Sequence, residues 1–150
     1  MQEDSTSLYD EDFHAWTRRQ AALMRDLVAR RWNGPLDLDR LADEVEDLGK
    51  AQRNLLRSQV RRVVEHLLKL DHSPAEAPRA GWRRTVVSAR AEIDDALTPT
   101  LRKDLEGRLP RLYAQAREQA ALALEAEGEA EAAGKLPDTC PYDLKAILEG

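Results

Sequence analysis

The chain has 150 residues, the length of one ordinary domain and enough for a hydrophobic core. Hydrophobic residues make up 42% and charged residues 34%, so the composition excludes a chain that is disordered throughout. The net charge of −5 disfavours a dedicated nucleic-acid binder.

The sequence carries no recognisable targeting segment. It starts with the acidic stretch MQEDSTSLYDEDF, which lacks the apolar core of a signal peptide. No apolar run approaches the roughly 20 residues of a membrane span. Cys140 is the single cysteine, so an internal disulfide is excluded. We therefore expect no membrane association and a soluble protein in a reducing, cytoplasmic setting.

The first half of the chain predicts two helices, since apolar residues recur with helical period. The first covers residues 10–31, and its apolar stripe consists of Phe13, Trp16, Gln20, Leu23, Met24 and Leu27. Asn33-Gly34-Pro35 ends it. The second covers residues 37–70, and its apolar face consists of Leu38, Leu41, Val45, Leu48, Leu55, Leu56, Val60, Val63, Leu67 and Leu70.

The second helix is long for a domain of this size. At 1.5 Å per residue it spans about 50 Å, whereas a compact globule of this length is about 38 Å across. Either the domain is an elongated bundle or the helix bends. Gly49 is the one break that the sequence offers.

The second half predicts shorter helices after a loop over residues 71–81. One helix covers residues 82–97, and Thr98-Pro99 starts a short helix that Gly107 and Pro110 interrupt. A fifth helix takes over from Leu112. We predict an all-α, up-and-down bundle of about five helices over residues 10–124. Residues 1–9 are expected to be disordered, and residues 125–150 to form an acidic Ala/Glu-rich tail that frays before a short last helix.

Metal and nucleophile chemistry find little support in the sequence. His66 and His72 are about 240° apart on a helix, so they cannot chelate one ion. Cys140 precedes a proline in a predicted linker and has no histidine near it in sequence. We therefore predict no metal, no cofactor and no established catalytic residue.

One group of polar residues remains a candidate site. Glu44 and His66 share one edge of the second helix, but they lie about 33 Å apart along it unless Gly49 breaks it sharply. Trp82 follows the 71–81 loop, so antiparallel packing would bring it near His66. An enzyme or small-ligand site of Glu44, His66 and Trp82 is one hypothesis; a solvated acid and a hydrogen-bonded boundary histidine is the simpler alternative.

A row of arginines forms a candidate basic face on the same helix. Arg53, Arg57 and Arg61 are spaced by four and line one face, which suits phosphate contacts. No aromatic platform accompanies them, and an acidic helix of the same chain, such as residues 118–131, would satisfy them equally well. Regulatory nucleic-acid binding is therefore the weaker alternative.

Several short stretches together resemble the bacterial "domain of unknown function 29" family. They are YDEDFHAW (9–16), LADEVEDLGK (41–50), VEHLLK (64–69), GWR (81–83) and LPDTCPY (136–142). The resemblance covers nearly the whole chain and implies a small all-helical bacterial protein without an established activity. With no chemical motif present, the favoured function is a protein-interaction or self-associating module that forms a homo-oligomer or binds a partner protein.

Overall fold

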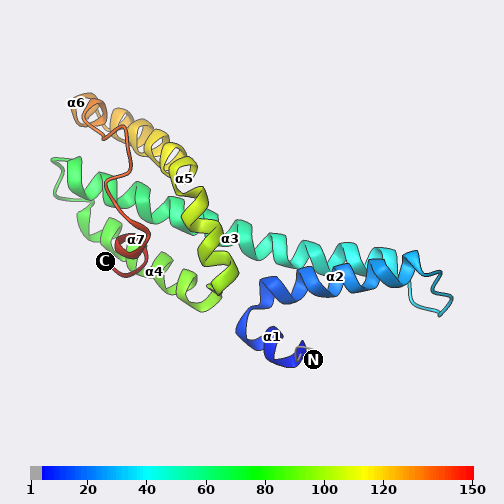
Figure 1. Cartoon of the computed structure of the whole chain (residues 1–150). Helices are drawn as coiled ribbons and strands as arrows, with labels where there is room; N and C mark the ends of the chain where they lie inside the picture. The colour runs from blue at the N-terminus through cyan, green and yellow to red at the C-terminus, as the bar shows by residue number, and fades with distance from the viewer. Residues whose placement is uncertain (1–4) are drawn as a thin grey trace. The chain divides into compact units, whose positions relative to one another are not determined.

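The structure is a computed structural model that describes residues 5–150, and Figure 1 shows its helices. In chain order these are α1 (Ser5–Glu11), α2 (Phe13–Ala29), α3 (Leu38–His72), α4 (Arg79–Ala96), α5 (Pro99–Ala126), α6 (Ala130–Gly134) and α7 (Leu144–Glu149). Within the described residues there is no strand. The predicted all-α class is confirmed. Ser5–Glu11 is helical, although residues 1–9 were expected to be disordered; residues 1–4 lie outside the described part.

Gly49 does not break α3. The helix runs without interruption from Leu38 to His72, and Gly49 lies inside it. Asp37 directly precedes the helix and accepts a hydrogen bond from the backbone N–H of Arg40 at 3.3 Å. His72, expected in the following loop, is the last residue of the helix.

Pro110 lies inside α5, so the predicted interruption at Gly107 and Pro110 is wrong. Thr98 caps this helix as expected, because its hydroxyl accepts a hydrogen bond from the Leu101 N–H at 3.2 Å. A proline within a helix removes one backbone hydrogen bond. Buried Leu105 and Leu112 on either side of Pro110 hold the helix to the core, which offsets that loss.

The chain groups into two compact units. The N-terminal unit consists of the chain up to Leu55 together with Thr98–Arg102, and the C-terminal unit of Leu56–Leu97 together with Lys103–Gly150. In the N-terminal unit, α2 lies beside the first part of α3 (Figure 1). We call this pair of helices the hairpin.

Asp12 joins the start of α2 to the start of α5 within the N-terminal unit. Its carboxylate accepts hydrogen bonds from the Ala15 N–H at 2.9 Å, which caps α2, and from the Thr100 N–H at 2.8 Å and hydroxyl at 2.7 Å. Burial alone would raise the pKa of Asp12, but the hydrogen bonds from Thr100 and Ala15 outweigh burial and lower this pKa.

Large aliphatic side chains fill the core of the C-terminal unit. Those with relative exposure below 2% are Leu56, Val60, Val63, Val64, Leu68, Ile93, Leu105, Leu112, Leu124 and Ile147. The region expected to fray is packed instead, since Ala133 and Leu136 are buried. Arg117 donates hydrogen bonds to the carbonyl of Leu136 at 3.1 Å and to that of Pro137 at 2.9 Å, which fixes the chain after α6.

Candidate functional site

The two helices of the hairpin meet through small and polar residues. His14, Thr17 and Ala21 are buried on α2, and a Cβ added at Gly49 of α3 would lie 2.2 Å from Thr17 Oγ1. The ring Nδ1 of His14 lies 3.0 Å from the Gly49 carbonyl oxygen. Gly49 is therefore a site of close helix approach rather than a bend.

One side of the hairpin is closed by ion pairs. Arg25 of α2 donates to Asp43 at 3.0 Å and to Glu46 at 2.5 Å, both on α3. The hydrogen bond from Arg25 lowers the pKa of Glu46, and the bonds to Glu46 and Asp43 raise the pKa of Arg25. His14 contacts Gly49, and Arg25 pairs with Asp43. From the first contact to the second, the residue numbers rise along α2 and fall along α3, so the two helices are antiparallel.

Leucines line the opposite side of the hairpin. On α3, Leu41, Leu48 and Leu55 are 39%, 56% and 47% exposed and are spaced by seven residues. On α2, Leu23 and Leu27 are 49% and 42% exposed. We call these five leucines the apolar face.

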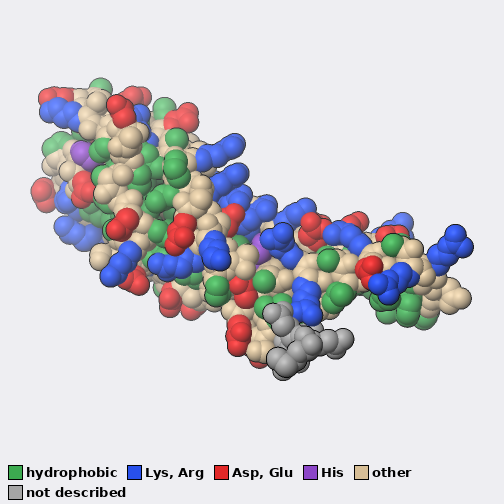
Figure 2. Space-filling model, in the orientation of Figure 1, with side chains coloured by type: hydrophobic (Ala, Val, Ile, Leu, Met, Phe, Trp, Pro, Cys, Tyr) green, Lys and Arg blue, Asp and Glu red, His purple; other side chains and the backbone are tan. Residues whose placement is uncertain are grey.

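Helix geometry places the five leucines on one side. Leu41 and Leu48 directly precede the inward residues Ala42 and Gly49, and Leu27 precedes the half-buried Val28. Each residue turns a helix by about 100°, and in an antiparallel pair the preceding residues of both helices point to the same side. Figure 2 shows hydrophobic side chains at the surface of this part of the molecule, among acidic and basic ones.

Aromatic residues lie near both ends of α2. At its start, the Tyr9 ring packs edge-on against Phe13 at 5.4 Å and against Trp16 at 4.9 Å between centroids. At the other end Trp32 is 44% exposed, and its ring lies over Gly34 so closely that a Cβ there would be 2.1 Å from it.

The residues of the predicted polar site lie in different surroundings. Glu44 is exposed on α3, and the sharp break at Gly49 that it would need to reach His66 is absent from the helix. His66 is half-buried, its Nδ1 lies 2.8 Å from the Arg62 carbonyl oxygen, and burial lowers its pKa. Trp82 lies under Lys69, whose Nζ is 5.1 Å from the ring centroid.

The predicted basic face is largely engaged within the chain. Arg57 donates two hydrogen bonds to Asp104 of α5, at 2.8 and 2.5 Å, which raise the pKa of Arg57. Arg61 donates to Gln115 at 3.2 Å. Arg53 is half-buried, and its guanidinium lies 3.4 Å from the Asn54 side chain. Helix α5 thus supplies the partners of Arg57 and Arg61, and both partners lie outside residues 118–131. Nucleic-acid binding stays a prediction.

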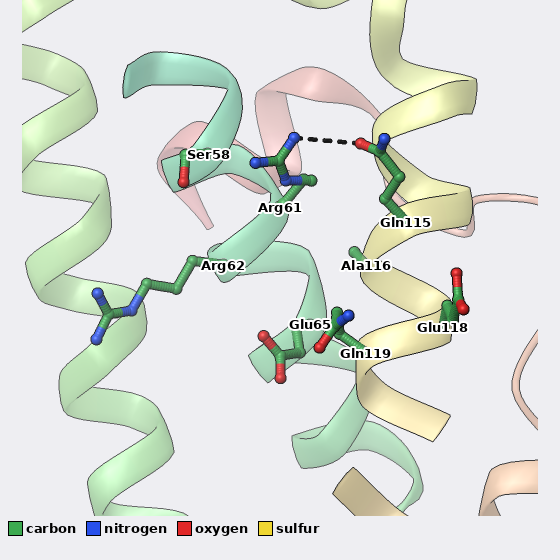
Figure 3. A pocket seen from close by; sticks show the side chains of 8 residues that line it. All are labelled: Ser58, Arg61, Arg62, Glu65, Gln115, Ala116, Glu118 and Gln119. Atoms are coloured by element: carbon green, nitrogen blue, oxygen red, sulfur yellow. Dashed lines mark hydrogen bonds between the residues drawn. The ribbon is translucent and has the colours of Figure 1, made fainter. Parts of the chain in front are cut away.

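A polar groove of about 520 Å³ lies between α3 and α5 in the C-terminal unit. Figure 3 shows its lining residues, which are Ser58, Arg61, Arg62, Glu65, Gln115, Ala116, Glu118 and Gln119. The lining holds two arginines and two glutamates, and Arg61 is hydrogen-bonded to Gln115, so the groove has no excess charge for an ionic ligand.

The structure also bears on metal sites and on membrane spans. Among the residues that the structure describes, no group of three or more His, Cys, Asp or Glu side chains is placed to hold a metal ion. Over the same residues, no helix has the length and apolar character that crossing a bilayer requires.

Comparison with known proteins places the chain in a family of helical proteins. The family model described as "Domain of unknown function DUF29" matches residues 8–150, so the chain belongs to this family. A solved structure of an alpha-helical protein of unknown function from Rhodospirillum rubrum is similar, with a TM-score of 0.80 and 26% identity. The match covers 99% of this chain and 91% of that one. No curated protein matches the chain.

These findings define a small helical protein with no established activity, as the sequence predicted. Sequence reasoning missed the exposed leucines, because helical period alone assigned Leu41, Leu48 and Leu55 to a buried face. Their phase, one residue before the buried positions 42, 49 and 56, is the signal that separates the two faces.

Proposed function

We propose that this protein is a protein-interaction module and that its apolar face binds another helical surface. The observation that carries this proposal is the apolar face itself: five leucines, 39–56% exposed, share one side of the hairpin, while ion pairs close the other side. Large contiguous apolar surfaces on proteins mark binding sites, because covering them removes apolar area from water.

The geometry of the apolar face suits a helical partner. Residues spaced by seven on α3 form the seam along which helices pack with side chains interlocked. Burial of apolar surface contributes about 25 cal/mol per Å² removed from water, so leucines at the centre of such a seam supply most of the binding free energy. The hairpin already provides two rigid helices, which lowers the conformational entropy that binding would cost.

Photo-crosslinking in living cells tests the proposal. A photoreactive amino acid replaces Leu48 in one variant and Val87, 66% exposed on α4, in the matched control. We expect a discrete crosslinked protein product from position 48 and none from position 87. Absence of a product at position 48, or equal products at both positions, would overturn the proposal.

We also propose that the protein works in the reducing cytoplasm of a bacterium. The support is the single cysteine, since disulfides characterise oxidising compartments. Burial raises the pKa of the Cys140 thiol, which keeps it protonated and weakly reactive. Subcellular fractionation with an antibody to the chain tests this assignment: recovery in the periplasm or the medium would contradict it.

A further inference from the structure

We infer that the surface bound by the apolar face is the apolar face of a second copy of this chain, so that two hairpins form a four-helix bundle. In this arrangement the two-fold axis runs parallel to the helices, and α2 of one copy packs against α3 of the other. The inference rests on the proposed function and names its partner.

Charge separation between the two helices favours this partner. Residues 36–49, which include the start of α3, hold six acidic residues and one basic residue. Residues 13–31, which include α2, hold five arginines and one aspartate. A surface with a basic half and an acidic half is self-complementary under a two-fold rotation that places each half on the other.

The outer edges of the apolar face carry three complementary pairs of charges. Within the hairpin, Thr17 lies at the level of Gly49 and Arg25 at the level of Asp43. We count residues along the two antiparallel helices from these two contacts. Three oppositely charged pairs on the outer edges then lie at the same height along the helix axis: Arg19 with Asp47, Asp26 with Arg40, and Arg30 with Asp37.

These pairs cannot form within one hairpin, because the two outer edges face away from each other. Rotation about a two-fold axis parallel to the helices leaves the height of each residue along that axis unchanged. It also places the outer edge of α2 beside the outer edge of α3 of the other copy. The charges of the two edges then alternate in complementary order. Asp26 and Arg40 are held in exposed pairs, Arg30–Asp26 at 3.1 Å and Arg40–Asp37 at 3.1 Å.

The leucines interlock at the same register. Leu27 is level with Leu41 of the other copy, and Leu23 falls between the heights of Leu41 and Leu48 of that copy. This is the offset that allows side chains of one helix to fit between those of the next. The alternative stacking, α2 on α2 and α3 on α3, would place acidic edges against each other and basic edges against each other, which is unfavourable.

Charge reversal with rescue tests the arrangement on the full chain. Sedimentation equilibrium measures the dimer dissociation constant of the unmodified protein, of Asp26→Arg, of Arg40→Asp and of the double variant. Each single change creates two like-charge pairs across the two-fold axis, so we expect the dissociation constant to rise about tenfold. The double variant restores opposite charges and is expected to return close to the original value.

Matched controls lie on the other side of the hairpin. Asp39→Arg and Arg18→Asp make the same charge changes at residues that directly follow the inward residues Leu38 and Thr17, and we expect no change in dimer affinity. Single variants that dimerise as well as the unmodified chain, or a double variant without recovery, would overturn the inference. A chain that stays monomeric up to millimolar concentration would also overturn it, while crosslinks from position 48 to a different protein would leave the proposed function standing.

Discussion

The two units use their apolar side chains in opposite ways. In the C-terminal unit, leucines, valines and isoleucines of α3, α4, α5 and α7 are buried. In the N-terminal unit, small residues such as Ala21, Ala42 and Gly49 lie between the helices, and large leucines stay at the surface. Eight of the ten exposed large hydrophobic residues in the described part belong to the N-terminal unit. One helix, α3, thus carries both buried core residues and exposed leucines.

Truncation of a leucine in each unit should give the largest contrast. Leu68 is 0% exposed and Leu48 is 56% exposed. We expect Leu68→Ala to lower the free energy of unfolding by about 2–5 kcal/mol, because it leaves a cavity, and Leu48→Ala to lower that of the monomer by less than about 1 kcal/mol. Urea denaturation followed by circular dichroism at low protein concentration measures both. Equal losses would mean that Leu48 belongs to a core.

Removal of the Asp12 carboxylate should destabilise the N-terminal unit selectively. We expect Asp12→Ala to cost about 2–3 kcal/mol, because the cap of α2 and both bonds from Thr100 are lost. Fluorescence of Trp16 and Trp32 in a Trp82→Phe background reports unfolding of this unit. Asp10→Ala, at an exposed neighbour, is the control and should change little.

The Asp12 effect should also depend on pH. The folded-state pKa lies below the ordinary value of 3.8, so the folded protein binds this proton less readily than the unfolded chain. The stabilisation is therefore complete above pH 3.8 and is lost as the pH falls through the lower folded-state value. A difference between Asp12→Ala and the unmodified protein that stayed constant in acid would contradict this assignment.

Two glycine substitutions compare close packing with open space. Gly49→Ala should destabilise the hairpin by about 1–2 kcal/mol, since overpacking against Thr17 exceeds the gain of about 1 kcal/mol in helix propensity. Gly107→Ala in α5 meets no atom within 4 Å and should stabilise its helix by up to about 1 kcal/mol. Thermal melts of both variants measure the difference. Stabilisation by Gly49→Ala would show that the helices are not in close contact there.

The smallest expected effect concerns His66. Burial lowers the pKa of its imidazole below 6.5, so protonation favours the unfolded chain. The stability of the C-terminal unit should be flat above pH 6.5 and decline as the pH falls below it, and His66→Gln should flatten that decline. Urea midpoints of both proteins across this pH range test the effect, with His72→Gln as the control.

The sequence predicted where the helices lie better than it predicted which residues pack against one another. Helical period and caps placed α2, α3 and α4 within a few residues, because Asp37 and Gly34-Pro35 act locally. The sequence did not predict that α5 continues through Pro110. Buried residues on both sides of Pro110 hold the helix together there, and their burial depends on the tertiary structure. The sequence left open whether the helix breaks at Gly49, because the role of this residue, close approach to Thr17, depends on a residue of another helix. Which leucines stay exposed depends on tertiary contacts in the same way.

The solution mass of the unmodified chain tests the central claim most directly. Light scattering after size-exclusion chromatography, over rising protein concentration, compares it with Leu48→Glu. We expect the unmodified protein to approach twice the 17.0 kDa of one chain, and Leu48→Glu to remain at one chain with unchanged helical content. A single-chain mass for the unmodified protein at every concentration, or equal dimerisation of Leu48→Glu, would contradict the claim that a second copy covers the apolar face.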